Sequence, residues 1–505
     1  MKIFSTKSTT KNFQIGAPEA EAESMNKSRI KLSDVFEDFL EILPELDYEK
    51  FIITGRKGCG KTAIGERLYF LSKNKPNYFV DFVRKEDIDI EKIIQTSKDA
   101  GHEIEQELLF KWIILIKFLK MLTTNESLQH IKGMNDLKHF IKRNAGYIDI
   151  KNFEITELIK SNGFEIKVEN FKSFGSKFNK DWQFKGGKAP FYKLIPHLEE
   201  TILSVMGADM NVNKYYLIFD DLDIGINLDN PSNLSTLINL IRLSKDFNNN
   251  LFGKNGIDAK VVILLRDDIS KILKRTGADT AKMFSSYEIP LIWYEHDLFR
   301  IDENLLKLKK FIDKRIEFNF KKNNIALSHP KNPWDSLIEN DSSFYKESSF
   351  KYVIGHSFYK PRDLILFFKP LSHFEFQIPL KPQDVNKLLG KYSSEAIDEI
   401  NNELSAFLNK HEIDYVFKGI RKFINVQCIK YDDFIAELSK FNFSKSIHEV
   451  IELLFNYSII GNREKGSRDV YLKYREGKEA EIRFNKDLDI IIHYIVKVYL
   501  LNNIE

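Results

Sequence analysis

One stretch of the sequence has the residue types and spacing to bind phosphate. It has the form GxxxxGK[ST] of a phosphate-binding loop, or P-loop. Glycines allow successive backbone N–H groups to face inward, where they bind phosphate oxygens. The lysine would reach the β- and γ-phosphates, and the hydroxyl after it would ligate Mg²⁺. The residues expected at a nucleotide are Gly55, Arg56, Lys57, Gly58, Cys59, Gly60, Lys61, Thr62 and Ala63.

Two adjacent carboxylates follow a second apolar run. Asp220 and Asp221 come directly after 215–219, and Asp223 stands close behind them. A P-loop needs a carboxylate from a neighbouring strand to hold Mg²⁺, and Asp220 is predicted to do this. Asp221 is predicted to polarise the attacking water as a general base. The alternative is an acidic turn that ends a strand.

Two arginines are candidates for stabilising phosphate charge. Arg266 ends the apolar run 260–265, where a cation would stabilise the transition state. Its alternative is an ion pair with Asp267 or Asp268. Arg362 follows a proline that opens a helix, and would reach the nucleotide from a lid. Its alternative is a packing or capping role.

The elements that position these residues alternate along the chain. The pattern predicts strands over 51–54, 78–83, 215–219, 260–265 and 287–293. Helices are predicted over 63–72, 104–122 and 232–247. Strands that alternate with helices favour an α/β fold with a doubly wound parallel sheet. The fold class predicted for this part is a P-loop NTPase, and the resemblance described below implies the AAA+-like (ASCE) kind.

The flanking regions are predicted to form further domains. We expect an N-terminal extension over 1–46, with a helix at 32–46, and a core over 47–294 with an insertion at about 100–211. Within the insertion, 163–184 is predicted to be β-rich. A helical lid should cover 295–378, with a loop at 322–348. The C-terminal domain, 379–505, should hold helices, a hairpin of 470–474 with 481–484, and a last helix at 490–500. This order suggests a winged helix or another helix-plus-hairpin module.

Several charged residues in these regions are interpreted as solvent-exposed. The acidic run Glu19–Glu23 is expected to form a solvated helical face, and Arg300 and Arg315 are read in the same way. In the predicted hairpin, basic residues alternate with glutamates. A solvated hairpin is therefore favoured there over a surface that binds nucleic acid.

Composition excludes some classes of protein. The chain has 505 residues, is 43% hydrophobic and carries a formal net charge of +3, so it has no global basic field for wrapping nucleic acid. A local basic patch stays open. Its two cysteines, Cys59 and Cys428, form no CxxC pair, which argues against a disulfide framework or structural zinc. Apolar stretches are interrupted by charges, so we expect no membrane span and a cytoplasmic location.

The order of these motifs resembles a known group of proteins. Gly55–Thr62, Asp220–Asp223, Arg266–Asp268 and Pro361–Asp363 follow one another as in the AAA+-related STAND and KAP-type P-loop ATPases, especially bacterial ones with the series GRKGxGKT, DDLD, RxD and PRD. The likeness covers roughly residues 13–380. The chain differs in its long insertion and in lacking an evident repeat array.

The resemblance implies roles for individual residues. Lys61 and Thr62 match the Walker A residues, and Asp220 and Asp221 match the Walker B pair. The second Walker B residue is often Glu in related ATPases. The shorter side chain of Asp221 therefore implies a lower rate of hydrolysis. The sensor arginines would be Arg266 at the strand end and Arg362 in the lid.

The resemblance also implies a cofactor and partners. ATP with Mg²⁺ would drive a switch in a homo-oligomer, with an effector or sensor protein encoded nearby as partner. Several relatives act in bacterial antiphage defence. Two alternatives stay open: a DNA-acting ATPase like replication initiators or helicase loaders, and a nucleotide-binding scaffold with little turnover.

Overall fold

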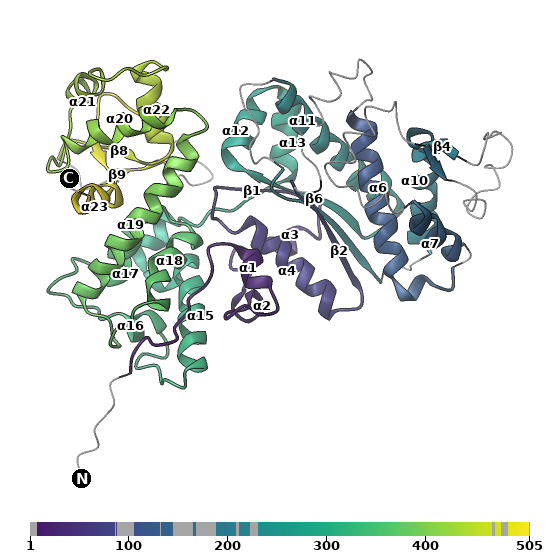
Figure 1. Ribbon diagram of the computed structural model, residues 1–505, viewed down its shortest axis with the longest axis horizontal. Coiled ribbons are helices and arrows are strands. Elements are labelled where there is room, and N and C mark those ends of the chain that lie inside the picture. The colour runs from purple at the N-terminus through teal and green to yellow at the C-terminus, as the bar shows by residue number, and fades with distance from the viewer. Residues whose placement is uncertain are drawn as a thin grey trace, which may run out of the picture. The chain divides into compact units, whose positions relative to one another are not determined.

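The computed structural model describes most of the chain. The described residues are 8–85, 87, 106–131, 133–144, 165–167, 188–208, 212–222, 231–466, 470–475 and 483–503. Figure 1 shows their helices and strands with the labels used below. The chain divides into two compact units. The sheet unit comprises Glu41–Lys57 and Lys61–Leu291, and the helical unit comprises Met1–Leu40, Gly58–Gly60 and Ile292–Glu505.

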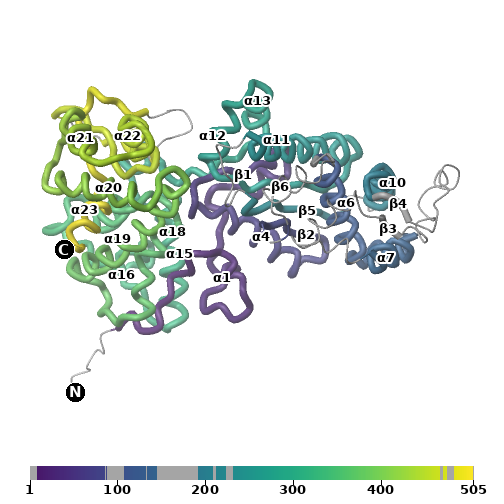
Figure 2. Tube along the Cα trace, turned by 45° about the horizontal axis from the view of Figure 1, so that its top comes forward, coloured from purple at the N-terminus to yellow at the C-terminus, as the bar shows by residue number. Residues whose placement is uncertain are grey.

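The sheet unit is built on a parallel sheet of five strands, which run through its middle in Figure 2. Its strands are β1 (Ile52–Gly55), β2 (Tyr78–Val83), β5 (Lys214–Phe219), β6 (Ala259–Arg266) and β7 (Glu288–Pro290). Their order across the sheet is β2-β5-β6-β1-β7. The prediction of an α/β fold with a parallel sheet is confirmed. The last strand is shorter than predicted because its partner β1 turns into the glycine-rich loop after Gly55.

Helices cover both faces of this sheet. They are α3 (Ile42–Glu45), α4 (Lys61–Asn74), α6 (Gln106–Thr124), α7 (Met134–Arg143), α10 (Phe191–Gly207), α11 (Pro231–Asp246), α12 (Asp267–Arg275) and α13 (Ala278–Tyr287), with a π-helix at Phe247–Phe252 and 3₁₀ turns at Glu126–Leu128 and Gly253–Asn255. The helices predicted over 63–72, 104–122 and 232–247 are confirmed as α4, α6 and α11.

Alternate residues of each buried strand face opposite sides of the sheet. Leu217 and Phe219 of β5 join a core cluster with α6, α10 and α11. Ile218 faces the other side, where Gly65 of α4 packs against it and against Phe82. A Cβ at Gly65 would lie 2.9 Å from the Phe82 ring, so only glycine lets α4 approach this closely. This close packing fixes the start of α4, and with it the end of the glycine-rich loop.

The insertion supplies much of one face of the core. Trp112 of α6 and Phe191 of α10 are buried and meet edge to face, with ring centroids 5.8 Å apart. Two short strands, β3 (Glu165–Lys167) and β4 (Lys188–Pro190), pair antiparallel. β3 lies within 163–184, the segment predicted to be β-rich, whereas β4 follows that segment. The rest of 163–184 lies outside the described residues. The insertion is thus partly integrated into the sheet unit.

Apolar helices of the described chain are packed within the protein. Lys117 interrupts the apolar sequence of α6 and donates to the carbonyl of Phe82 at 2.9 Å. None of the helices in the described ranges has the length and apolar character needed to span a membrane.

The helical unit includes residues 295–378, for which a helical lid is predicted. Its helices up to residue 372 are α1 (Ala20–Ser24), α2 (Leu32–Val35), α14 (His296–Ile301), α15 (Lys307–Lys322), α16 (Pro333–Leu337), α17 (Ser349–Gly355) and α18 (Pro361–Phe368), with 3₁₀ turns at Glu303–Leu305 and Lys369–Ser372. The single helix predicted over 32–46 is wrong, because Glu41 has a left-handed φ of 56° and Pro44 follows it. The loop predicted at 322–348 contains α16, which buries Trp334 completely.

The N-terminal segment is held along the helical unit by specific contacts. Thr9 forms an antiparallel bridge with Gln377. Farther along, Glu23 accepts two hydrogen bonds of 2.8 Å from Arg315 of α15. Only 2% of the Glu23 side chain and 3% of the Arg315 side chain are exposed. The prediction that both side chains are solvated is therefore wrong, because each neutralises the other's charge inside the unit.

Replacing Arg315 with alanine should destabilise the helical unit by about 3 kcal/mol, because Glu23 would remain buried without its partner. Urea denaturation measures this free energy of unfolding. Lys314→Ala is a matched control, since Lys314 also pairs with an N-terminal acid, Glu37 at 3.4 Å, but at the surface. The free energy of unfolding of Lys314→Ala should fall by less than about 1 kcal/mol. Equal losses in the two variants would contradict the assignment of Arg315–Glu23 as the stabilising pair.

The C-terminal part adds a small antiparallel sheet to a group of helices. Its elements are α19 (Pro382–Leu404), α20 (Lys410–Arg421), α21 (Tyr431–Leu438), α22 (Ile447–Asn456), β8 (Ile460–Arg463), β9 (Val470–Tyr471), a 3₁₀ turn (Lys473–Arg475), β10 (Asp489–Ile492) and α23 (Tyr494–Asn502). The sheet order is β10-β8-β9. β9, within the predicted strand 470–474, pairs with β8, which the sequence pattern missed. Residues 481 and 482 lie outside the described residues, so the predicted pairing of 470–474 with 481–484 stays a prediction.

Candidate functional site

The glycine-rich loop joins a buried strand to a helix. All four residues of β1 are buried, and α4 begins at Lys61. Within the loop, Gly58 and Gly60 have φ angles of +85° and +98°. These left-handed conformations are unfavourable for residues with a Cβ atom. The two glycines are therefore required by the backbone, and the strand, loop and helix follow one another as the sequence predicts.

Lys61 folds back across the start of this loop. Its ammonium group donates to the carbonyl of Gly55 at 2.8 Å and to that of Arg56 at 3.4 Å. The lysine is only partly buried, so its charge stays accessible from the loop. A positive charge and the N-terminus of a 14-residue helix thus meet at one place, which suits the binding of an anion.

Asp220 lies at the end of β5, close to the start of α4, although β6 separates β5 from β1 in the sheet. Burial, and then the neighbouring charge of Asp221, raise the pKa of Asp220 to about 7. The nearby Thr62 hydroxyl and the cations Lys61 and Arg84 act in the opposite direction. The structure therefore brings Asp220 together with Lys61 and Thr62, as predicted for the site.

One oxygen of Asp220 suits a metal ion. Its Oδ1 atom accepts a hydrogen bond of 3.0 Å from the backbone N–H of Asp221. Its Oδ2 atom is buried and has no hydrogen-bond partner among the described residues. Mg²⁺ prefers hard oxygen ligands, such as carboxylates and hydroxyls. Asp220 and the hydroxyl of Thr62 thus provide the donor chemistry that Mg²⁺ needs.

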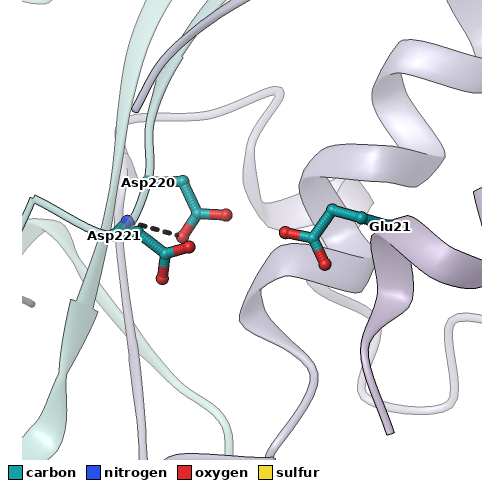
Figure 3. A group of neighbouring side chains, drawn as sticks. All are labelled: Glu21, Asp220 and Asp221. Carbon is teal, nitrogen blue, oxygen red and sulfur yellow. Dashed lines mark hydrogen bonds between the residues drawn. The ribbon is translucent and has the colours of Figure 1, made fainter. Parts of the chain in front are cut away.

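Asp221 adopts a backbone conformation that few residues with side chains use. Its φ is +57°, which aspartate tolerates better than most residues. Figure 3 shows its carboxylate next to that of Asp220, with the hydrogen bond between the two residues drawn. Asp221 is less buried than Asp220. Asp223 lies outside the described residues.

Arg266 ends β6 and lies opposite Gly55 in the register with β1. Its guanidinium group is paired with Asp268, with Nε 3.1 Å from Oδ1 and a second bond from Nη2 to Oδ2. The ion pair considered as an alternative is therefore present. The role of Arg266 toward a γ-phosphate stays a prediction, and it requires at least part of this pairing to open.

Two further charged residues lie at this edge of the sheet: Asp267, which the sequence suggested only as a partner of Arg266, and Arg84, which it did not single out. Asp267 has a lowered pKa: burial alone would raise it, but Lys271, Arg56 and Lys61 outweigh that effect. Arg84 follows β2, forms an ion pair with Glu66 of α4 and lowers the pKa of Asp220. Both follow parallel strands directly, and the carboxyl ends of parallel strands are where ligands bind. Applying that rule to each predicted strand would have found them.

Arg362 is adjacent to the glycine-rich loop within the helical unit. Its backbone N–H donates to the carbonyl of Gly58 at 3.3 Å. A Cβ at Gly58 would lie 2.9 Å from the Cβ of Arg362. The guanidinium group has protein partners: Nε donates to the carbonyl of Pro18 at 2.9 Å, and Nη1 to Glu399 of α19 at 3.2 Å. The predicted packing role is thus real, and a role in contacting phosphate stays a prediction.

Comparison with protein families identifies part of the helical unit. Residues 306–401 match the family model described as the FunZ-associated C-terminal helical domain. A search of curated proteins finds no match to the chain. The matched residues extend from the segment before α15 into α19, so they include both Arg362 and Glu399. This part of the helical unit is therefore similar to a FunZ-associated helical domain.

Proposed function

We propose that this protein binds ATP with Mg²⁺ at the glycine-rich loop and hydrolyses it, as an AAA+-like (ASCE) P-loop NTPase. The observation that carries the proposal is the position of Asp220. It stands on a different strand from the loop, yet its buried carboxylate lies near Lys61 and Thr62. A carboxylate, an ammonium group and a hydroxyl in this combination suit a magnesium nucleotide.

The residues would share the work of hydrolysis. Thr62 and Asp220 would hold Mg²⁺, which neutralises phosphate charge when bound. A water molecule would attack the γ-phosphorus with its oxygen, and Asp221 would accept the proton that this water loses. The bond from that phosphorus to the oxygen of the β-phosphate breaks, which leaves ADP and inorganic phosphate. Lys61 would stabilise the charge on the phosphate oxygens during this step.

The pairing of both arginines supports a nucleotide-driven switch. Arg266 is held by Asp268, and Arg362 by Glu399. A γ-phosphate that attracts either guanidinium would weaken its existing pair. For Arg362 that change would reach α19, the longest helix of the C-terminal part, through Glu399. Nucleotide state would thus alter the contacts of the helical unit.

The biological setting is also part of the proposal. A role in bacterial antiphage defence is proposed from the resemblance of the motifs, and the match of residues 306–401 to a FunZ-associated domain supports a defence-linked protein. A homo-oligomer that acts with an effector or sensor protein encoded nearby is proposed from the resemblance of the motifs, and a cytoplasmic location from the charges that interrupt the apolar stretches. Size measurement with and without Mg·ATP would test the oligomer, and co-purification with products of neighbouring genes would test the partner.

Asp221→Asn tests hydrolysis separately from binding. Loss of the general base should lower the rate of phosphate release by about 100-fold or more. The affinity for Mg·ATP should change little, because Asp221 is not proposed to bind the nucleotide. Asp279→Asn is the control, since Asp279 is exposed and pairs with Arg242 on α11. If Asp221→Asn hydrolyses ATP at the unaltered rate, Asp221 is not the general base. If the unaltered protein itself shows no turnover, a nucleotide-binding scaffold is favoured.

One observation bears on the alternative, a DNA-acting ATPase. The order α20, α21, α22, β8 and β10, with an antiparallel bridge from Ile429 to Ile490, is typical of a winged helix. In such a domain α22 would enter the major groove. Its exposed side chains include Glu449 and Glu452, which DNA phosphates would repel. We therefore favour a protein-contacting module, and salt-sensitive binding to duplex DNA would reverse that preference.

A further inference from the structure

Two carbonyl groups of the glycine-rich loop, those of Gly58 and Cys59, accept hydrogen bonds from residues of the same compact unit. The indole Nε1–H of Trp293 donates to the carbonyl of Cys59 at 2.9 Å, in a buried hydrogen bond. The backbone N–H of Arg362 donates to the carbonyl of Gly58 at 3.3 Å. Gly58–Gly60 and both donors belong to the same compact unit. Two successive peptide groups of the loop are thus each fixed from one side.

Fixing a carbonyl also fixes the amide N–H of the same peptide. In a planar trans peptide the C=O and N–H bonds point in opposite directions. The carbonyl of Gly58 shares its peptide with the N–H of Cys59, and the carbonyl of Cys59 shares its peptide with the N–H of Gly60. Among the described residues the one cis peptide is Ile378–Pro379, so both loop peptides are trans. The N–H of Cys59 therefore points away from Arg362, and the N–H of Gly60 points away from Trp293.

A loop conformation that directs these two N–H groups toward an anion needs support from outside the loop. Successive N–H groups that converge on one side bind anions, but without an anion their dipoles repel one another. The left-handed Gly58 and Gly60 make the conformation accessible without making it the preferred one. Hydrogen bonds to the opposite side of the same peptides would stabilise it before any ligand arrives. Holding a binding site in its bound form reduces the cost of binding.

We propose that Trp293 and the backbone N–H of Arg362 are positioning groups that hold the amides of Cys59 and Gly60 ready for phosphate. The inference rests on the proposed function, because the phosphate is that of the nucleotide. In addition, Trp293 and Arg362 would set the backbone conformation of Gly58–Gly60, which belong to the same compact unit. Trp293 is the group that mutation can test, since a backbone N–H cannot be removed without changing the helix start at Pro361.

Trp293→Phe removes the indole donor and keeps an aromatic ring. Trp293 is nearly buried and meets Phe311 edge to face, with ring centroids 5.8 Å apart, which a phenyl ring can partly preserve. Loss of one buried hydrogen bond should weaken the affinity for Mg·ATP and for Mg·ADP alike, by about 3- to 10-fold. Both nucleotides should be affected because the amides bind phosphates that both contain.

Trp334→Phe provides a matched control. The indole of Trp334 is fully buried in the same unit and donates to the hydroxyl of Ser349 at 3.0 Å, far along the chain from the loop. This variant loses an equivalent hydrogen bond, so its stability should fall, but its affinity for nucleotide should not. Unaltered affinity in Trp293→Phe would overturn the inference. An equal loss of affinity in Trp334→Phe would also overturn it, because the cause would then be general destabilisation.

A second measurement requires no nucleotide. Hydrogen–deuterium exchange of the free protein should be faster at the amides of Cys59 and Gly60 in Trp293→Phe, and unchanged there in Trp334→Phe. Equal exchange in both variants would contradict a positioning role. Failure of the unaltered protein to bind ATP would instead count against the proposed function, and the exchange result would still report on the loop. The two ideas can therefore fail separately.

Discussion

Replacing Lys61 with alanine should reduce the affinity for Mg·ATP by about 100-fold or more, and phosphate release should fall below detection. The ammonium group supplies the mobile positive charge of the loop, and charge-assisted hydrogen bonds to phosphate are among the strongest in proteins. In the free protein this group is bonded to the carbonyls of Gly55 and Arg56. The Lys61 ammonium group therefore already lies along the loop, and on binding of a nucleotide it would exchange these carbonyls for phosphate oxygens.

Calorimetric titration with Mg·ATP measures the affinity, and a phosphate assay measures turnover. Lys73→Ala is the control, because Lys73 lies on the same helix, is exposed and is placed over the ring of Tyr69 rather than near the loop. It changes the net charge equally and should bind as the unaltered protein does. An affinity in Lys61→Ala within about threefold of the unaltered value would rule out the proposed nucleotide site.

Asp220→Asn should abolish Mg²⁺-dependent turnover and stabilise the free protein at alkaline pH. The folded protein retains the Asp220 proton up to a pKa of about 7, whereas the ordinary value is 3.8. Between these values the folded state binds more protons than the unfolded state. Its stability therefore falls as the pH rises through this window. Removing the ionisable group should recover on the order of 3 kcal/mol at pH 8 to 9.

Thermal unfolding at pH 5 and at pH 8.5 tests this sign. At pH 5 Asp220 is protonated in the folded protein, so the Asn variant should gain much less there than at pH 8.5. Added Mg·ATP should stabilise the unaltered protein, and more strongly above pH 7, where the carboxylate is ionised. A variant that is equally destabilised at both pH values would show that Asp220 is a structural residue.

Local sequence signals predicted the centre of the fold well. The strands at β1, β2, β5 and β6 are short apolar runs that end on glycine or on charged residues, and each lies where the pattern placed it. Three of them, β1, β5 and β6, are mostly buried within a parallel sheet, so their hydrophobicity does not depend on distant partners. The carboxylate of Asp220 was predicted for the same reason, because it follows one of these runs.

Residues whose environment depends on distant parts of the chain were predicted poorly. Glu23 and Arg315 were each interpreted as solvated, and only their mutual contact, across 292 positions, makes both buried. Trp293 was assigned to a strand because it ends an apolar run. No local pattern shows that its indole would reach the carbonyl of Cys59. β8, the partner of β9, was not predicted, since alternating residues do not specify which strand is the partner.

The path of the N-terminal segment has a consequence for synthesis of the chain. The helical unit is discontinuous: its first residues leave the ribosome long before residues 292–505, with which they pack. The bridge between Thr9 and Gln377 closes across more than 360 positions. Domains generally fold as units while the chain is made. The sheet unit can therefore fold while the N-terminal segment is still without its partners, and docking of that segment becomes a late event in assembly.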